Sequence, residues 1–175
     1  MGTPSMSEDD PISRLARHIE AAHEAERLVR SDEIADLRRQ AALGLHTTCA
    51  EFVLSVNTRL AKPRLDLSPA TYAPDLFRET GINVFQVSSE GRQMQITFAA
   101  PRQPVATEKF AIPYILEGEI RTYSQKMLER FEISTRMIFF CVASDRADWR
   151  YFDWRTRSTG AIDRGFLISL MEPLF

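Results

Sequence analysis

The chain has 175 residues, of which 44% are hydrophobic and 26% are charged, and its formal net charge is -2. This near balance excludes an overall field that would draw the protein to nucleic acid or to an anionic membrane. A chain of this length buries roughly 70% of its unfolded surface, so it needs neither disulfides nor a structural metal to fold.

The first 62 residues are predicted to be helical after a polar tail. Residues 1–10 are acidic and polar and are expected to be disordered. A helical segment over residues 11–62 begins with Asp10 and Pro11, which suit a helix start, and ends before Pro63. Ser31 and Asp32 offer a second cap, so one rod of helix and a helical hairpin both stay open.

The apolar stripe of this segment is thin at its beginning and wide further on. Early positions at helical spacing are Ile12, Leu15 and Ile19. From residue 33 to 61 the stripe is much wider, which indicates substantial burial of that half. The thin part is expected to pack on the wide part or on a second chain, and we favour a homodimer or another protein partner.

Residues 63–175 are predicted to form a sheet domain, in one compact unit with the second half of the helical segment. A short helix is expected over residues 74–80 and strands over 82–88, 93–99, 112–123, 135–143 and 149–155. A short helix over 125–131 and a helix over 163–171 accompany them. The strand over 135–143 is apolar on both faces and is expected to be central. The predicted fold class is therefore α+β: a helical N-terminal arm or hairpin, then a mostly antiparallel sheet of about five strands flanked by short helices and a C-terminal helix.

Signatures of catalysis and of metal binding are missing or incomplete. The sequence has no G-x-S-x-G elbow, no phosphate-binding glycine loop and no zinc spacing. His46 and Cys49 are expected to belong to the packed helix face. Carboxylates on one strand and around a hairpin could hold Mg²⁺, but we expect them to be solvent-facing strand acids. They are Glu117, Glu119, Asp145, Asp148 and Asp153. No metal and no cofactor is predicted.

The densest signal is the segment from Trp149 to Arg157, which holds both tryptophans and three arginines. Aromatic and arginine side chains in alternation suit base stacking or an aromatic-walled pocket, and equally a final strand packed by helices. Residues 157–162 are expected to form a loop, and this loop and the start of the last helix suggest an anion or ligand site. Its candidate residues are Tyr151, Asp153, Arg155, Arg157 and Arg164.

These observations predict a non-catalytic binding or assembly protein that acts by protein contact through its N-terminal helices. The alternatives are a ligand-binding domain or enzyme with a pocket at the C-terminal strand, and a nucleic-acid-binding module that uses the same strand. Two cysteines in apolar runs, no apolar leader and no apolar run of about 20 residues predict a cytoplasmic protein without a membrane span.

Overall fold

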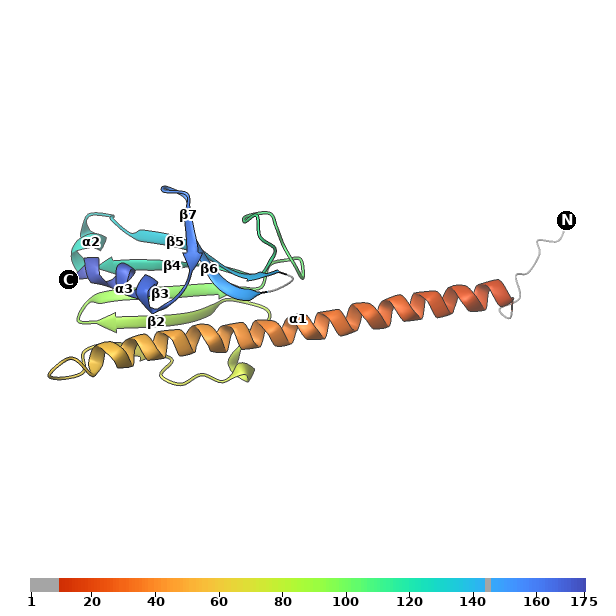
Figure 1. Cartoon of the computed structure of the whole chain (residues 1–175), viewed down its shortest axis with the longest axis horizontal. Helices are drawn as coiled ribbons and strands as arrows, with labels where there is room; N and C mark the ends of the chain where they lie inside the picture. The colour runs from red at the N-terminus through yellow and green to blue at the C-terminus, as the bar shows by residue number, and fades with distance from the viewer. Residues whose placement is uncertain (1–9, 144–145) are drawn as a thin grey trace. The chain divides into compact units, whose positions relative to one another are not determined.

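A computed structural model describes residues 10–143 and 146–175, without the side chains of residues 24–29. The predicted tail lies almost entirely outside the described residues, as does Asp145. Helices and one antiparallel sheet make up the fold (Figure 1), which confirms the α+β class. The chain divides into two compact units, Met1–Asp36 and Leu37–Phe175.

The helical segment is a single helix, α1, from Pro11 to Asn57. No break occurs at Ser31, because Ser and Asp in a helix interior cost only a few tenths of a kcal/mol and no proline or glycine interrupts the segment there. The helix ends before the predicted boundary at residue 62. The Asn57 side chain accepts hydrogen bonds from the backbone N–H groups of Arg64 and Leu65, both at 3.0 Å, and so fixes the turn that follows.

Seven strands form the sheet, and each is antiparallel to its neighbours in chain order. This number exceeds the five that were predicted. The strands are β1 (Asp66–Ser68), β2 (Asn83–Ser89), β3 (Arg92–Ala99), β4 (Tyr114–Ser124), β5 (Ser134–Val142), β6 (Ala147–Asp153) and β7 (Ser158–Ala161). The short helices are η1 (Pro74–Leu76), α2 (Gln125–Glu129) and η2 (Glu172–Leu174), and α3 spans Arg164–Met171.

The two additional strands are the edges of the sheet, and residues 157–162 were expected to be a loop. Both edge strands are short and lack an alternation of large apolar residues. Pairing with a longer neighbour fixes each of them: Leu67 lies opposite Val87, and Gly160 lies opposite Tyr151. Such strands owe their conformation to the neighbouring ladder rather than to their own propensity.

One face of the sheet is covered by helices. From α1, His46 packs edge-on against Phe85 of β2 with ring centroids 5.2 Å apart. The Trp149 indole N–H of β6 donates to the carbonyl of Ala41 at 2.8 Å. On the same face, the Phe166 ring of α3 stacks on Tyr151 at 4.0 Å. The main core therefore lies between the sheet and these two helices.

The opposite face carries a smaller core under the loop between β3 and β4. Phe110 of this loop stacks on Phe139 of β5 at 4.9 Å, and Ala106 bridges to Tyr114. Beside it, β3 and β4 approach so closely at Gly118 that a Cβ atom there would overlap the carbonyl oxygen of Thr97. Only glycine fits at this position without a shift of the backbone.

The C-terminal segment is packed on the fold, as its apolar composition predicts. Asp163 caps α3 by accepting a hydrogen bond from the Phe166 N–H at 2.8 Å. The buried side chains that follow are Leu167, Leu170, Met171 and Leu174. The Arg92 guanidinium holds the end of the chain by donating to the carbonyl of Leu174 at 2.7 Å.

Candidate functional site

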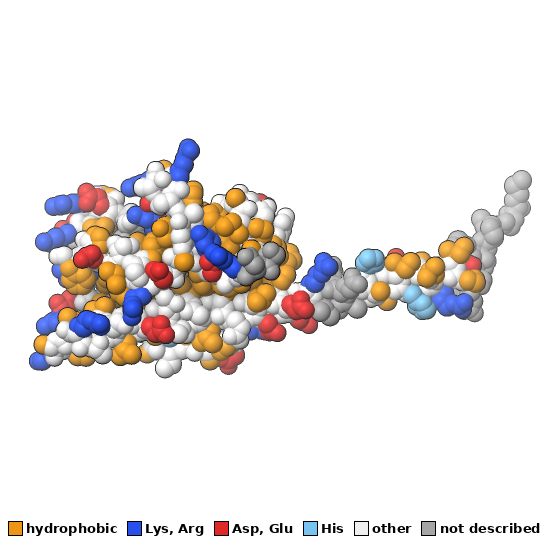
Figure 2. All heavy atoms as spheres, viewed as in Figure 1, with side chains coloured by type: hydrophobic (Ala, Val, Ile, Leu, Met, Phe, Trp, Pro, Cys, Tyr) orange, Lys and Arg blue, Asp and Glu red, His pale blue; other side chains and the backbone are white. Residues whose placement is uncertain are grey.

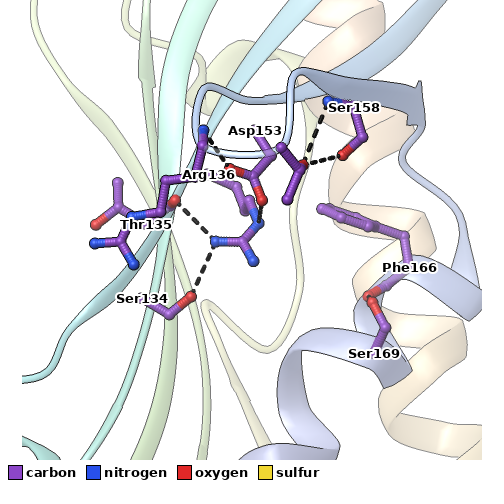
Figure 3. A network of polar contacts seen from close by, with 9 residues as sticks. Ser134, Thr135, Arg136, Asp153, Ser158, Phe166 and Ser169 are labelled. Carbon is purple, nitrogen blue, oxygen red and sulfur yellow. Dashed lines mark hydrogen bonds and ion pairs between the residues drawn. The ribbon is translucent and has the colours of Figure 1, made fainter.

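Two of the predicted site residues, Tyr151 and Asp153, lie on the helix-covered face of β6. The ring of Tyr151 is sandwiched between Phe166 and the backbone at Gly160, where a Cβ atom would lie 3.0 Å from the ring. Asp153 was expected to face solvent but is buried, because the Arg155 N–H, at 2.9 Å, and the Arg136 Nε, at 3.2 Å, bind its carboxylate. Figure 3 shows the Arg136 guanidinium pointing toward the Asp153 carboxylate.

The pKa of Asp153 reflects two opposing effects. Burial raises it, whereas the hydrogen bond from the Arg155 N–H and the charge of Arg136 lower it. The lowering effects prevail, so the pKa lies below its ordinary value and the carboxylate is ionised at neutral pH. The groups that bind the Asp153 carboxylate are thus residues of this chain, and their contacts stabilise the β6–β7 hairpin.

The three predicted arginines are not gathered in one place. Arg155 and Arg157 lie in the exposed turn between β6 and β7, where Arg155 covers the Trp154 ring at 5.5 Å and Arg157 has a φ of 57°. Arg164 is the first residue of α3, and its guanidinium points to the Ser55 hydroxyl of α1 at 3.4 Å. Whether Tyr151, Asp153, Arg155, Arg157 and Arg164 share an anion stays a prediction.

The aromatic residues of β6 are engaged by the protein itself. Trp149 and Tyr151 face the helices, and the Trp149 indole N–H is bonded to α1. Trp154 is 62% exposed and lies just after the strand. Side chains of residues 149–153 therefore alternate between the two faces of β6, as the sequence predicts. The face that carries Trp149 and Tyr151 belongs to the core between the sheet and the helices.

Acidic and metal-ligating residues are also paired or packed. Glu117 binds the Lys109 Nζ at 2.8 Å and Glu119 pairs with Arg121. His46 packs between Tyr72 and Phe85, and burial raises the pKa of the Cys49 thiol to about 12. Within residues 10–143 and 146–175, no three His, Cys, Asp or Glu side chains are grouped so that they could hold a metal ion.

A groove lies between the end of α1 and α3. Its larger hollow, of about 420 Å³, is walled mainly by apolar side chains, among them Phe52, Leu60, Ile168 and Phe175. A neighbouring hollow of about 410 Å³ shares four lining residues with it and adds Ser55, Arg59 and Arg164. The groove thus joins an apolar floor to a basic rim, and its size is within the range of small-molecule sites.

The rim has two arginines without an acidic partner. Arg59 donates from its guanidinium to the Ser55 carbonyl at 2.6 Å, and Arg164 donates to the Ser55 hydroxyl. Neither guanidinium forms an ion pair with any carboxylate in the described part of the chain. A third arginine at the groove, Arg64, pairs with Glu90 at 2.5 Å.

A second exposed apolar surface lies in the unit that ends at Asp36. Ile12, Leu15 and Ile19 are 76%, 60% and 50% exposed. Figure 2 shows orange hydrophobic side chains along the described turns of this part of α1, beside the pale blue histidines. The spacing of these residues places them on one side of the helix.

Sequence reasoning found Arg164 and missed the rest of the groove. Ser55 and Arg164 are 109 positions apart, and no local pattern predicts that α3 packs beside the last turns of α1. A partial signal is the apolar ending Leu174–Phe175, which contributes Phe175 to the groove.

No protein family, no curated protein and no solved structure matches this chain. None of the helices in the described residues has the length and apolar character that crossing a membrane requires.

Proposed function

We propose that the chain is a non-catalytic binding and assembly protein that associates with a second copy of itself through the first part of α1. The observation that carries this proposal is the exposed apolar stripe of Ile12, Leu15 and Ile19. A cytoplasmic location belongs to the same proposal, and the free, buried thiols of Cys49 and Cys141 support it.

The stripe has the spacing of a short coiled-coil seam. Its residues follow the pattern i, i+3, i+7, which puts Ile12 and Ile19 at the first and Leu15 at the fourth position of a heptad. Isoleucine at the first and leucine at the fourth position favour two parallel strands over larger assemblies. A second copy is therefore the partner whose surface fits best.

Helix continuity makes so short a seam workable. An isolated helix that spans only the residues of the stripe, from Ile12 to Ile19, is marginal in water because its first turn is costly to nucleate. Since α1 runs from Pro11 to Asn57 without a break, the turns that carry the seam extend a helix that already exists. Association then has to bury the stripe without also having to nucleate the helix.

Light scattering of the purified chain tests the proposal. The wild type is expected at twice the 20.0 kDa of the monomer at high concentration, and at the monomer mass after dilution. Leu15→Glu places a charge in the seam and should give a monomer throughout.

Leu54→Glu is the matched control. Leu54 is 64% exposed on the same helix and lies outside both the stripe and the groove. This variant should associate like the wild type. A monomeric wild type at high concentration, or equal association of both variants, contradicts self-association through the stripe.

A further inference from the structure

The groove between α1 and α3 keeps large apolar side chains in contact with solvent. Leu60, Ile168 and Phe175 are 40%, 44% and 70% exposed, although they adjoin the fully packed Phe52. Apolar surface that is concave and partly open is typical of a site that a ligand completes.

Two cations converge beside this apolar floor. Both Arg59 and Arg164 donate to Ser55, one to its carbonyl and one to its hydroxyl, so their guanidinium groups meet at a single residue. Like charges held together in this way favour an anion between them, and a guanidinium binds a carboxylate through two parallel hydrogen bonds.

We propose that this groove binds a single-chain amphiphile with an anionic head, namely a medium-chain carboxylate. The head lies between Arg59 and Arg164 next to the Ser55 hydroxyl. The hydrocarbon tail lies along Val56, Leu60 and Ile168 and enters the larger hollow toward Phe175.

Charge sets the direction in which the ligand lies. The acidic side chain that lines the larger hollow is Glu172, which follows the last residue of α3. Arg164 begins that helix, so the two residues are separated by about 12 Å of helix rise. A carboxylate at the Arg164 end is close to the cations and far from Glu172.

The size of the groove favours a small amphiphile over a protein segment. Ten residues line the larger hollow, and the other hollow adds three further residues. A stable protein interface uses about 20–30 residues on each side. An acidic peptide or an anionic membrane would therefore engage this surface only in part.

The test is calorimetric titration of the full chain with hexanoate, octanoate and decanoate below their micelle concentrations, and with decanol. Affinity should rise about fourfold for each added methylene group, because each buries further apolar surface. Decanoate should bind about tenfold or more tightly than decanol, because hydrogen bonds to a charged group are the stronger ones.

Variants separate the head from the tail. Arg59→Gln and Arg164→Gln should each weaken decanoate by about tenfold and leave decanol within about twofold. Ile168→Asn should weaken both ligands. Arg130→Gln changes an exposed arginine after α2 and should bind both like the wild type. Equal melting temperatures would show that all variants are folded.

The proposal is overturned if decanoate does not bind to the wild type, if decanol binds as tightly as decanoate, or if both Arg→Gln variants keep the affinity of the wild type. Binding only to an acidic helical peptide, or only to vesicles of anionic phospholipid, also overturns it. Because Leu15→Glu leaves the groove intact, that monomeric variant should bind decanoate like the wild type. The binding test of the groove therefore succeeds or fails independently of the test of self-association.

Discussion

The residues of α1 before and after the division at Asp36 have the same backbone conformation but differ in the width of their apolar stripe. Before it, Ile12, Leu15 and Ile19 are at least half exposed. After it, Leu45 and Phe52 are 1% and 2% exposed. Both regions have helical periodicity, so periodicity alone distinguishes helix from strand but does not decide burial.

Burial follows from the number of adjacent apolar positions. In the second region Ala42, His46 and Cys49 widen the stripe, and all three are buried. A wide stripe removes enough surface from water to hold the helix on the sheet. A stripe of single residues at i, i+3 and i+7 supports only a narrow contact, such as a coiled-coil seam.

The largest expected difference between the two regions is in the effect of shortening a leucine. Leu45→Ala should lower the free energy of unfolding by about 2–5 kcal/mol, because it leaves a cavity between α1 and the sheet. Leu15→Ala should change it by less than about 0.5 kcal/mol at protein concentrations where the chain is monomeric. Urea unfolding followed by circular dichroism measures both.

The two leucine variants should also differ in how their free energy of unfolding depends on protein concentration. The effect of Leu45→Ala should be the same at all concentrations. The effect of Leu15→Ala should grow as the concentration rises, because association stabilises the folded chain by mass action. Equal losses for the two variants in dilute protein would show that the stripe before Asp36 is buried within the monomer.

A smaller effect is expected from the arginines of α1. Arg38 is buried and donates from Nε to the Ile115 carbonyl at 2.9 Å, where the register of β4 with β5 shifts. It also pairs with Glu79 and donates to the carbonyl of Pro104 at 3.1 Å. Arg38→Met should cost about 1.5–3 kcal/mol, because hydrogen bonds of a charged group are lost and their acceptors lose their partner.

Arg30→Met is the control in the exposed part of α1, before the division at Asp36. Arg30 is exposed, so this change should shift the free energy of unfolding by no more than about 0.5 kcal/mol. Thermal and urea unfolding of the two variants measure the difference. A loss for Arg38→Met as small as that for Arg30→Met would mean that the bonds to Ile115 and Pro104 contribute little.

The sequence was sufficient for the α+β class, for the five long strands and for the buried half of α1, because large apolar residues alternate or recur there at clear periods. It was insufficient at the sheet edges. Asp66–Ser68 and Ser158–Ala161 carry no such pattern, and their pairing with β2 and β6 determines their conformation. At Ser31 the sequence left one rod and a hairpin both open, and the structure has one rod, since a capping residue permits a helix start but does not prevent continuation.

The candidate site was less predictable than the fold. Arg164 stood out as a cation at a helix start, but its relation to Ser55 depends on the packing of α3 beside α1. Asp153 lies two residues from Arg155 in the sequence, but its ionic partner is Arg136 on the adjacent strand. Such partners are set by the register of β5 with β6, which places Met137 opposite Phe152.

The smallest expected effect concerns Cys49, whose thiol lies in the buried region of α1. Burial raises its pKa from 9.0 to about 12. Above pH 9 the unfolded chain releases this proton while the folded chain retains it, so stability falls as the pH rises between those two values. Below pH 9 both states keep the proton, and the thiol adds no pH dependence.

Cys49→Ala isolates this contribution when the free energy of unfolding is measured at pH 8 and at pH 10. Between these pH values the wild type should lose about 1.4 kcal/mol more than the variant, since its unfolded chain has one more thiolate that must take up a proton on folding. The raised pKa of Cys141, about 11, is present in both proteins and cancels. The comparison uses the change with pH, because the cavity left by Cys49→Ala lowers stability equally at both values. Equal alkaline losses would show that the Cys49 thiol reaches solvent in the folded chain, in contrast to its place on the buried side of α1.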